Sequence, residues 1–193
     1  LALLIGTLGS VGMWSVVVVL PVVQAEFGAT RADTSLAFAM AMLGFGIGGV
    51  ATGRLADRLG ILPAITLGIG ALLLGYVGAG LSTKLWQFTI VHFAIGLGAS
   101  ATFAPLMAEA SHWFVRRRGI AVTIAASGNY LAGAIWPPIV ERGTAFYGWR
   151  ATHIAVGVFC AVVMSIVLLV LRSSMRGTSR QTHAAMQPSV NLG

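Results

Sequence analysis

Residues 34–81 read TSLAFAMAMLGFGIGGVATGRLADRLGILPAITLGIGALLLGYVGAGL, two apolar runs separated by one short charged segment. Each run is about 20 residues long, the length that an α-helix needs to cross the hydrocarbon core of a bilayer. A helix of a soluble bundle would instead combine one apolar stripe with a charged opposite face. The stretch therefore predicts two membrane-spanning helices joined on one side of the membrane.

The same pattern repeats along the rest of the chain. Hydrophobic residues make up 57% of the 193 residues and charged residues only 9%, whereas a soluble domain carries about 25% charged residues. We expect an all-α polytopic membrane protein with a six-helix bundle over residues 1–171, its start truncated. Residues 172–193 are polar, and we expect a flexible cytoplasmic tail or the start of a central loop there. The six helices are expected at about 1–23, 34–52, 61–81, 85–110, 119–140 and 149–171.

The basic residues predict the orientation. The net charge is +7, but the arginines cluster in short connections, which argues against nucleic-acid binding. Eight lysines and arginines fall in 53–60, 116–118 and the segment after 171, and four fall on the other side, at Arg31, Lys84, Arg142 and Arg150. The positive-inside rule places the richer side, with both termini, in the cytoplasm of a plasma or inner membrane.

The charged segment GRLADRLG at residues 53–60 carries a more specific signal. Its glycines permit a sharp turn, and an acid beside arginines can form an ion pair or favour a helix start. The segment resembles the signature loop between helices two and three of major facilitator superfamily transporters. The resemblance implies that this loop, through Asp57 and Arg58, helps to lock the cytoplasmic side in the outward-open state. The gating residues that it implies are Gly53, Asp57, Arg58 and Gly60.

A second stretch, residues 96–150, contains GLG at 96–98, Pro105, WFVRRRGIA at 113–121, ASG at 126–128, Gly133, a proline pair at 137–138 and YGWR at 147–150. It is similar to the monocarboxylate-transporter and oxalate/formate-exchanger branch of that superfamily. The resemblance implies the N-terminal half of a twelve-helix fold that works with a C-terminal six-helix half. It also implies a small organic anion as substrate, coupled to protons or to a counter-anion.

Four residues within the expected helices, of which His92 lies early in its helix, are candidates for substrate or proton binding, because polar groups are costly inside a membrane. His92 could carry a coupled proton or contact a carboxylate, or it could be a structural histidine. Asn129 and Tyr130 could donate hydrogen bonds to a central cavity, or serve packing. Trp14 could line that cavity, although tryptophan is also common at membrane interfaces. His153 is expected at the interface.

Glu109 lies within reach of three consecutive arginines near the expected cytoplasmic end. A gating salt bridge with this basic cluster is one interpretation, and a simple interfacial ion pair is the other. The cluster consists of Arg116, Arg117 and Arg118.

Other functions fit the sequence less well. An intramembrane serine hydrolase would need a Gly-x-Ser-x-Gly motif, and Ser127 follows Ala125 and Ala126, without the first glycine. A channel or a non-transporting membrane subunit would not explain the loop at 53–60. We expect no enzyme activity, no metal site and no cofactor, with the bilayer, a small organic anion and a second six-helix half as partners.

Overall fold

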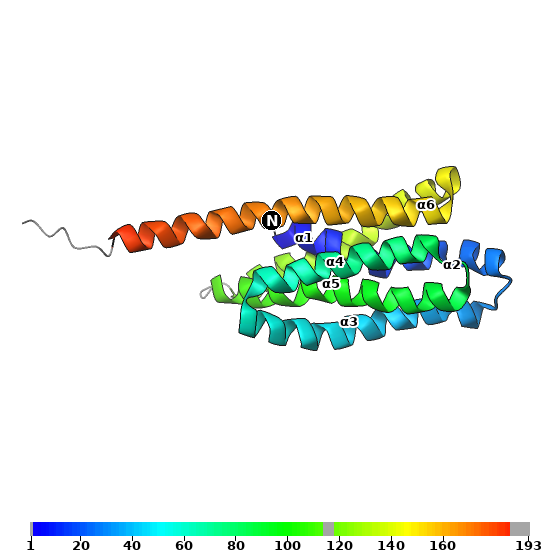
Figure 1. The fold of residues 1–193 in the computed structure, drawn as a ribbon, viewed down its shortest axis with the longest axis horizontal. Helices are drawn as coiled ribbons and strands as arrows, with labels where there is room; N and C mark the ends of the chain where they lie inside the picture. The colour runs from blue at the N-terminus through cyan, green and yellow to red at the C-terminus, as the bar shows by residue number, and fades with distance from the viewer. Residues whose placement is uncertain (1, 114–117, 186–193) are drawn as a thin grey trace, which may run out of the picture.

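The computed structural model describes the backbone of residues 2–113 and 118–185. Side chains are described throughout these ranges except at residues 2, 103–113, 118, 121, 122, 125, 171 and 173–185. All secondary structure in the described part of the chain is helical, which confirms the predicted fold class (Figure 1). The helices are α1 (Ala2–Gly9), α2 (Val11–Phe27), α3 (Arg31–Leu59), α4 (Ile61–Leu81), α5 (Leu85–Trp113) and α6 (Arg118–Ala185).

These helices form six rods in the order expected from the apolar runs. The N–H of Ser10 donates to the carbonyl of Gly6 at 3.1 Å, so α1 and α2 continue one another. The long α6 is divided at Gly148, where φ is +78°, a conformation that glycine adopts at little cost. We call residues 118–147 the first rod of α6 and residues 149–185 its second rod. Four stretches within the described residues are long and apolar enough to span a membrane: Leu3–Phe27, Arg31–Leu59, Ile61–Leu81 and Ala126–Val170, the last including parts of both rods.

The helices extend further than their apolar runs. The segment expected as a charged loop at 53–60 is instead the last two turns of α3, and only Gly60, with φ +88°, breaks the chain before α4. A helix satisfies its own backbone hydrogen bonds on leaving the membrane, and Arg58 in its last turn complements the helix dipole. The first rod of α6 likewise runs through the expected connection at 141–147.

The start of α3 and the end of α6 also extend beyond the apolar runs. The N-cap of α3 is Thr30, four residues before the expected start at 34, and Asp33 completes a capping box with it. After residue 171, where a flexible tail or the start of a central loop was expected, the second rod of α6 continues as helix to Ala185. Side-chain polarity therefore marks the membrane boundary better than it marks the end of a helix.

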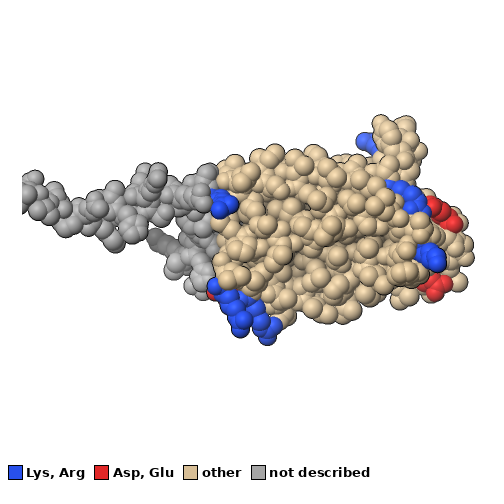
Figure 2. All heavy atoms as spheres, in the orientation of Figure 1, with Lys and Arg blue, Asp and Glu red and all other residues tan. Residues whose placement is uncertain are grey.

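The charged side chains lie at the two ends of the bundle. Figure 2 shows basic residues at the left end, basic and acidic residues at the right end, and a belt without charge between them. The described residues at one end include Arg54, Arg58 and Arg172, and at the other Glu26 and Arg150. An uncharged belt between two charged rims is what a bilayer requires, because charge is costly in its core. The chain is thus a multi-pass membrane protein.

Packing is closest around α5, which contacts α3 and α4 most extensively. A Cβ added at Gly96 would overlap the backbone carbonyl of Ala41 in α3, and one added at Gly44 would overlap the carbonyl of Phe93 in α5. A Cβ at Gly98 would lie 2.7 Å from the carbonyl oxygen of Gly68 in α4. Lipid tails supply no hydrophobic force between helices, so such close approach provides the van der Waals contact that holds them together.

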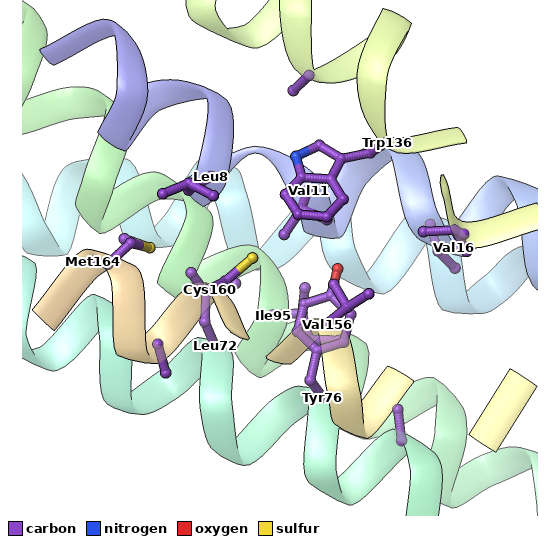
Figure 3. Close-up of a cluster of buried hydrophobic side chains, with 14 of the residues drawn as sticks. Leu8, Val11, Val16, Leu72, Tyr76, Ile95, Trp136, Val156, Cys160 and Met164 are labelled. Carbon is purple, nitrogen blue, oxygen red and sulfur yellow. The ribbon is translucent and has the colours of Figure 1, made fainter. Parts of the chain in front are cut away.

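A buried cluster closes the bundle on the other side of α5. Figure 3 shows Val11 of α2, Tyr76 of α4, Trp136 of the first rod and Cys160 of the second rod pointing toward one another. The Trp136 indole is 5% exposed and donates its N–H to the carbonyl of Thr7 at 2.9 Å. The cluster therefore joins the first span to both rods of α6.

Replacing Gly44 or Gly96 by alanine should destabilise the bundle, because the new methyl group meets backbone that cannot move aside. Overpacking of this kind costs about 1–3 kcal/mol. Gly46→Ala is the matched control on the same helix, since nothing lies within 4 Å of an added Cβ there, and alanine favours helix by about 1 kcal/mol. Unfolding in detergent, followed by circular dichroism, measures all three. Equal stability of the Gly44 and Gly46 variants would contradict the proposed packing.

Candidate functional site

Two of the predicted residues, Trp14 and Asn129, meet near mid-depth in the bundle. The Trp14 indole N–H donates to the backbone carbonyl of Asn129 at 3.1 Å and lies 3.4 Å from its side-chain oxygen Oδ1. Trp14 lies near the middle of the span Leu3–Phe27. Asn129 lies about 16 Å along the first rod of α6 from its start. The contact thus joins two spans at the depth where polar groups most often serve function.

Tyr130, the next residue, points away from the bundle and is 75% exposed. Neither its hydroxyl nor the side-chain NH2 of Asn129 has a hydrogen-bond partner among the described residues. A Cβ at Gly133 would lie 2.9 Å from the Trp14 ring, so the absence of a side chain there lets the indole reach Asn129. We call Trp14, Asn129 and Tyr130 the mid-depth polar face. The Tyr130 hydroxyl of this face is open to whatever covers this side of the bundle.

The fourth predicted residue, His92 of α5, is buried and does not belong to the mid-depth polar face. Its side chain is 0% exposed and packs on Phe88, with ring centroids 4.2 Å apart. The ring of His153, from the second rod of α6, lies 6.2 Å away and is 1% exposed. The sequence predicted His153 at the membrane interface; it lies five residues after the break at Gly148 and is buried in protein beside His92.

Hydrogen bonds fix the tautomer of both histidines. Nδ1 of His92 lies 2.7 Å from the Phe88 carbonyl, and Nδ1 of His153 lies 3.1 Å from the Trp149 carbonyl. A carbonyl only accepts, so Nδ1 carries the hydrogen in each ring and Nε2 presents a lone pair. Both Nε2 atoms are buried without a partner among the described residues. The pair is therefore a buried acceptor site that a proton or a water molecule could satisfy.

The histidines are part of a polar strip that sequence reasoning missed. The hydroxyls of Ser15 and Tyr76 lie 2.6 Å apart in the interior, and the Tyr76 ring lies 5.5 Å from that of His153. Ser15, Tyr76 and His153 come from three different spans, and no spacing in the sequence relates them. The one signal in the sequence is that each of these polar residues stands within a long apolar run, where a polar group without a hydrogen-bond partner is costly.

A second unpredicted group lies at the end of the bundle opposite Arg54 and Arg172. Arg150 pairs with Glu26 at 2.7 Å and also donates to the carbonyls of Gly80, at 3.2 Å, and Ser82. The Trp149 indole donates to the same carboxylate, and the Arg150 guanidinium lies 4.5 Å from the Trp149 ring centroid. We call this group the Glu26 clamp. It joins the ends of α2 and α4 to the start of the second rod.

The predicted gating residues at the arginine-rich end are only partly described. Gly53 lies within α3, Asp57 and Arg58 are exposed in its last two turns, and Gly60 forms the break before α4. Asp57 makes no ion pair with a described residue. Arg116 and Arg117 lie outside the described residues, as do the side chains of Glu109 and Arg118.

The model of the Major Facilitator Superfamily matches residues 2–191. The chain is 29% identical over 137 residues to the MFS-type transporter pynF of Aspergillus niger, covering 69% of this chain and 32% of the relative. It is 35% identical over 129 residues to the riboflavin transporter RibJ of Trypanosoma cruzi, covering 64% and 27%. It is 28% identical over 143 residues to the probable sulfoacetate transporter SauU of Cupriavidus necator, covering 71% and 32%. The chain thus spans about a third of the length of these relatives.

Breaking the Glu26 clamp should destabilise the end of the bundle where α2, α4 and the second rod of α6 meet. We expect Arg150→Gln to lower the free energy of unfolding more than Glu26→Gln, because the arginine also binds two backbone carbonyls. The pair is partly exposed, so its coupling energy in a double-mutant cycle should be about 0.5–1 kcal/mol. Arg142→Gln, at an exposed arginine of the same end, is the control and should change nothing. A coupling energy of zero would show that the two groups act independently.

Proposed function

The chain belongs to the major facilitator superfamily, and we propose that residues 1–171 form the first six-helix half of a secondary transporter for a small organic anion. The transporter works by alternating access, and the second six-helix half comes from a further part of the protein or from a partner chain. The family and the relatives named above are transporters rather than enzymes. Transporters built from two related halves hold their substrate near the midplane, between the halves.

The observation that carries this proposal is the mid-depth polar face. Trp14 and Asn129 meet at mid-depth, and Tyr130 is 75% exposed beside them. A polar group that faces lipid at this depth has no partner, so a substrate cavity or a second half of the protein is the more favourable neighbour. We place the substrate against this face, with the amide and hydroxyl donating to it.

An organic anion fits the chemistry of these donors. Carboxylate and sulfonate oxygens accept hydrogen bonds from N–H and O–H groups, and the face offers a side-chain amide and a hydroxyl without other described partners. Two further observations support the assignment. The segments at 113–121 and 137–138 resemble the monocarboxylate and oxalate/formate branch, and one relative is named for sulfoacetate.

We propose that His92, paired with His153, binds the coupled proton. The pair is closed within the bundle in this conformation, so a proton reaches it only when the spans around it separate. Alternating access moves one half against the other, so proton binding also requires a local opening between α5 and the second rod of α6. Coupling to a counter-anion is the alternative, and it would leave the histidine pair as a structural contact.

We further propose that the arginine-rich end faces the cytoplasm and serves as the gate. Its excess of lysine and arginine follows the positive-inside rule. In this proposal Asp57 and Arg58, exposed at the end of α3, close the gate by contacts with the second half. Glu109 and the basic cluster at 116–118 contribute on the neighbouring spans.

Uptake into proteoliposomes tests the substrate class directly. We expect the full protein to take up at least one of radiolabelled lactate, pyruvate, oxalate, formate or sulfoacetate with saturable kinetics. Tyr130→Phe should raise the KM by about threefold to tenfold, the loss of one hydrogen bond. Tyr147→Phe is the matched control, because Tyr147 is similarly exposed (79%) but lies at the end of the rod. Saturable uptake of riboflavin alone, or of none of these compounds, would overturn the assignment to organic anions.

A pH gradient tests the role of the histidine pair. His92→Gln keeps a hydrogen-bonding side chain but cannot take up a proton, so uptake should no longer respond to an inward proton gradient. Exchange of labelled for unlabelled substrate without a gradient should persist in this variant. Tyr76→Phe, which removes the hydroxyl bonded to Ser15, should keep the gradient response. Normal gradient-driven uptake by His92→Gln would assign the pair to structure alone.

A further inference from the structure

We propose that a groove at the arginine-rich end binds an anionic phospholipid of the surrounding leaflet. The groove has a volume of about 700 Å³ and lies between the end of α3, the start of α4 and the second rod of α6. Leu59, Ile61, Leu67, Leu168, Leu169 and Arg172 are among its lining residues. It lies on different helices from the mid-depth polar face, so the inference is independent of the transport proposal.

The walls of the groove suit an acyl chain. They are formed mainly by leucine and isoleucine side chains, of which Leu67 is 60% and Leu169 is 63% exposed. The hydroxyl of Thr66, also in the wall, is already bonded to the carbonyl of Leu62 at 2.9 Å. An apolar groove that opens on the lipid-facing side of membrane-spanning helices is filled most favourably by lipid, because contact between water and its apolar walls is unfavourable.

Arg172 gives the groove a charged mouth at headgroup depth. It follows directly on the apolar run that ends at Leu171, and basic residues at the end of a span lie at the level of the lipid headgroups. Its guanidinium is exposed and has no hydrogen bond or ion pair with a described residue. The group is therefore available to a lipid phosphate, which guanidinium binds through paired N–H donors.

The charge around the mouth favours an anion. Arg54 and Arg58 are exposed on the last turns of α3, near the groove wall at Leu55 and Leu59, and Asp57 is the one acidic residue among them. The described residues that line the groove include no acidic residue. Gly60, the N-cap of α4, supplies no side-chain cap, so the positive end of that helix dipole adds to the same potential.

Charge complementarity also favours a lipid over the chain's own C-terminal segment as the occupant of the groove. Residues 172–193 contain Arg172, Arg176 and Arg180 but no aspartate or glutamate. This segment therefore cannot neutralise the arginine at the mouth. A basic helix leaving the membrane at this point adds attraction for anionic lipids.

Native mass spectrometry of the full protein in detergent tests the proposal. Dioleoyl phosphatidylglycerol and dioleoyl phosphatidylcholine differ in headgroup charge but share their acyl chains. We expect the wild-type protein to retain the anionic lipid at least fivefold better, and Arg172→Gln to lose most of this preference. Arg172→Lys should keep most of it. Arg142→Gln removes an exposed arginine at the opposite end and is the matched control, which should behave as wild type.

A groove-filling variant and a competitor without acyl chains distinguish binding of a lipid from binding of a free anion. Leu169→Trp should weaken retention of both lipids, and the exposure of Leu169 allows the larger side chain without disturbing the core. Glycerol 3-phosphate should compete poorly because it has no acyl chain. Equal retention of the two lipids by wild type, an unchanged preference in Arg172→Gln, or full competition by glycerol 3-phosphate would each overturn the proposal. A preference that persists in Arg172→Gln but is abolished by the double variant Arg176→Gln, Arg180→Gln would overturn the groove and assign the lipid to the C-terminal segment instead.

Discussion

The bundle depends on direct backbone contact between α5 and its two neighbours. In a membrane the helices gain no hydrophobic free energy from meeting, so they are held by van der Waals contact and hydrogen bonds. Gly44 and Gly96 bring α3 and α5 to backbone contact, and Gly98 and Gly68 do the same for α5 and α4. Because α5 also carries His92, its position fixes which buried groups can meet.

Polar contacts in the bundle divide into those directed inward and those directed outward. The Ser15–Tyr76 contact and the histidine pair lie within the six rods and are closed to the surroundings. Tyr130 instead presents its hydroxyl at mid-depth on the outside, beside the half-buried Asn129. In the transporter half that we propose, the inward groups connect spans of one half, and the outward groups face the proposed substrate and second half.

The two ends of the bundle are built differently. At one end the Glu26 clamp joins three spans through a carboxylate, a guanidinium and an indole. At the other end Arg58, Asp57 and Arg172 are exposed and pair with no described residue. An end tied together and an end with free charge are suited to different roles: the first keeps the spans of this half in register, and the second remains open to lipid and to further protein.

Apolar runs of about 20 residues predicted the helices, their order and their insertion in a membrane, because the bilayer itself sets the required length and polarity. The loop at 53–60 likewise indicated the superfamily, although the structure makes most of it helix. Asn129 and Trp14 were marked by their polarity alone, without any sign that they touch. The meeting of His92 with His153, and of Glu26 with Arg150, could not be predicted from the sequence. Those contacts depend on which faces of the helices the small residues turn toward one another, and only the packed tertiary structure decides that.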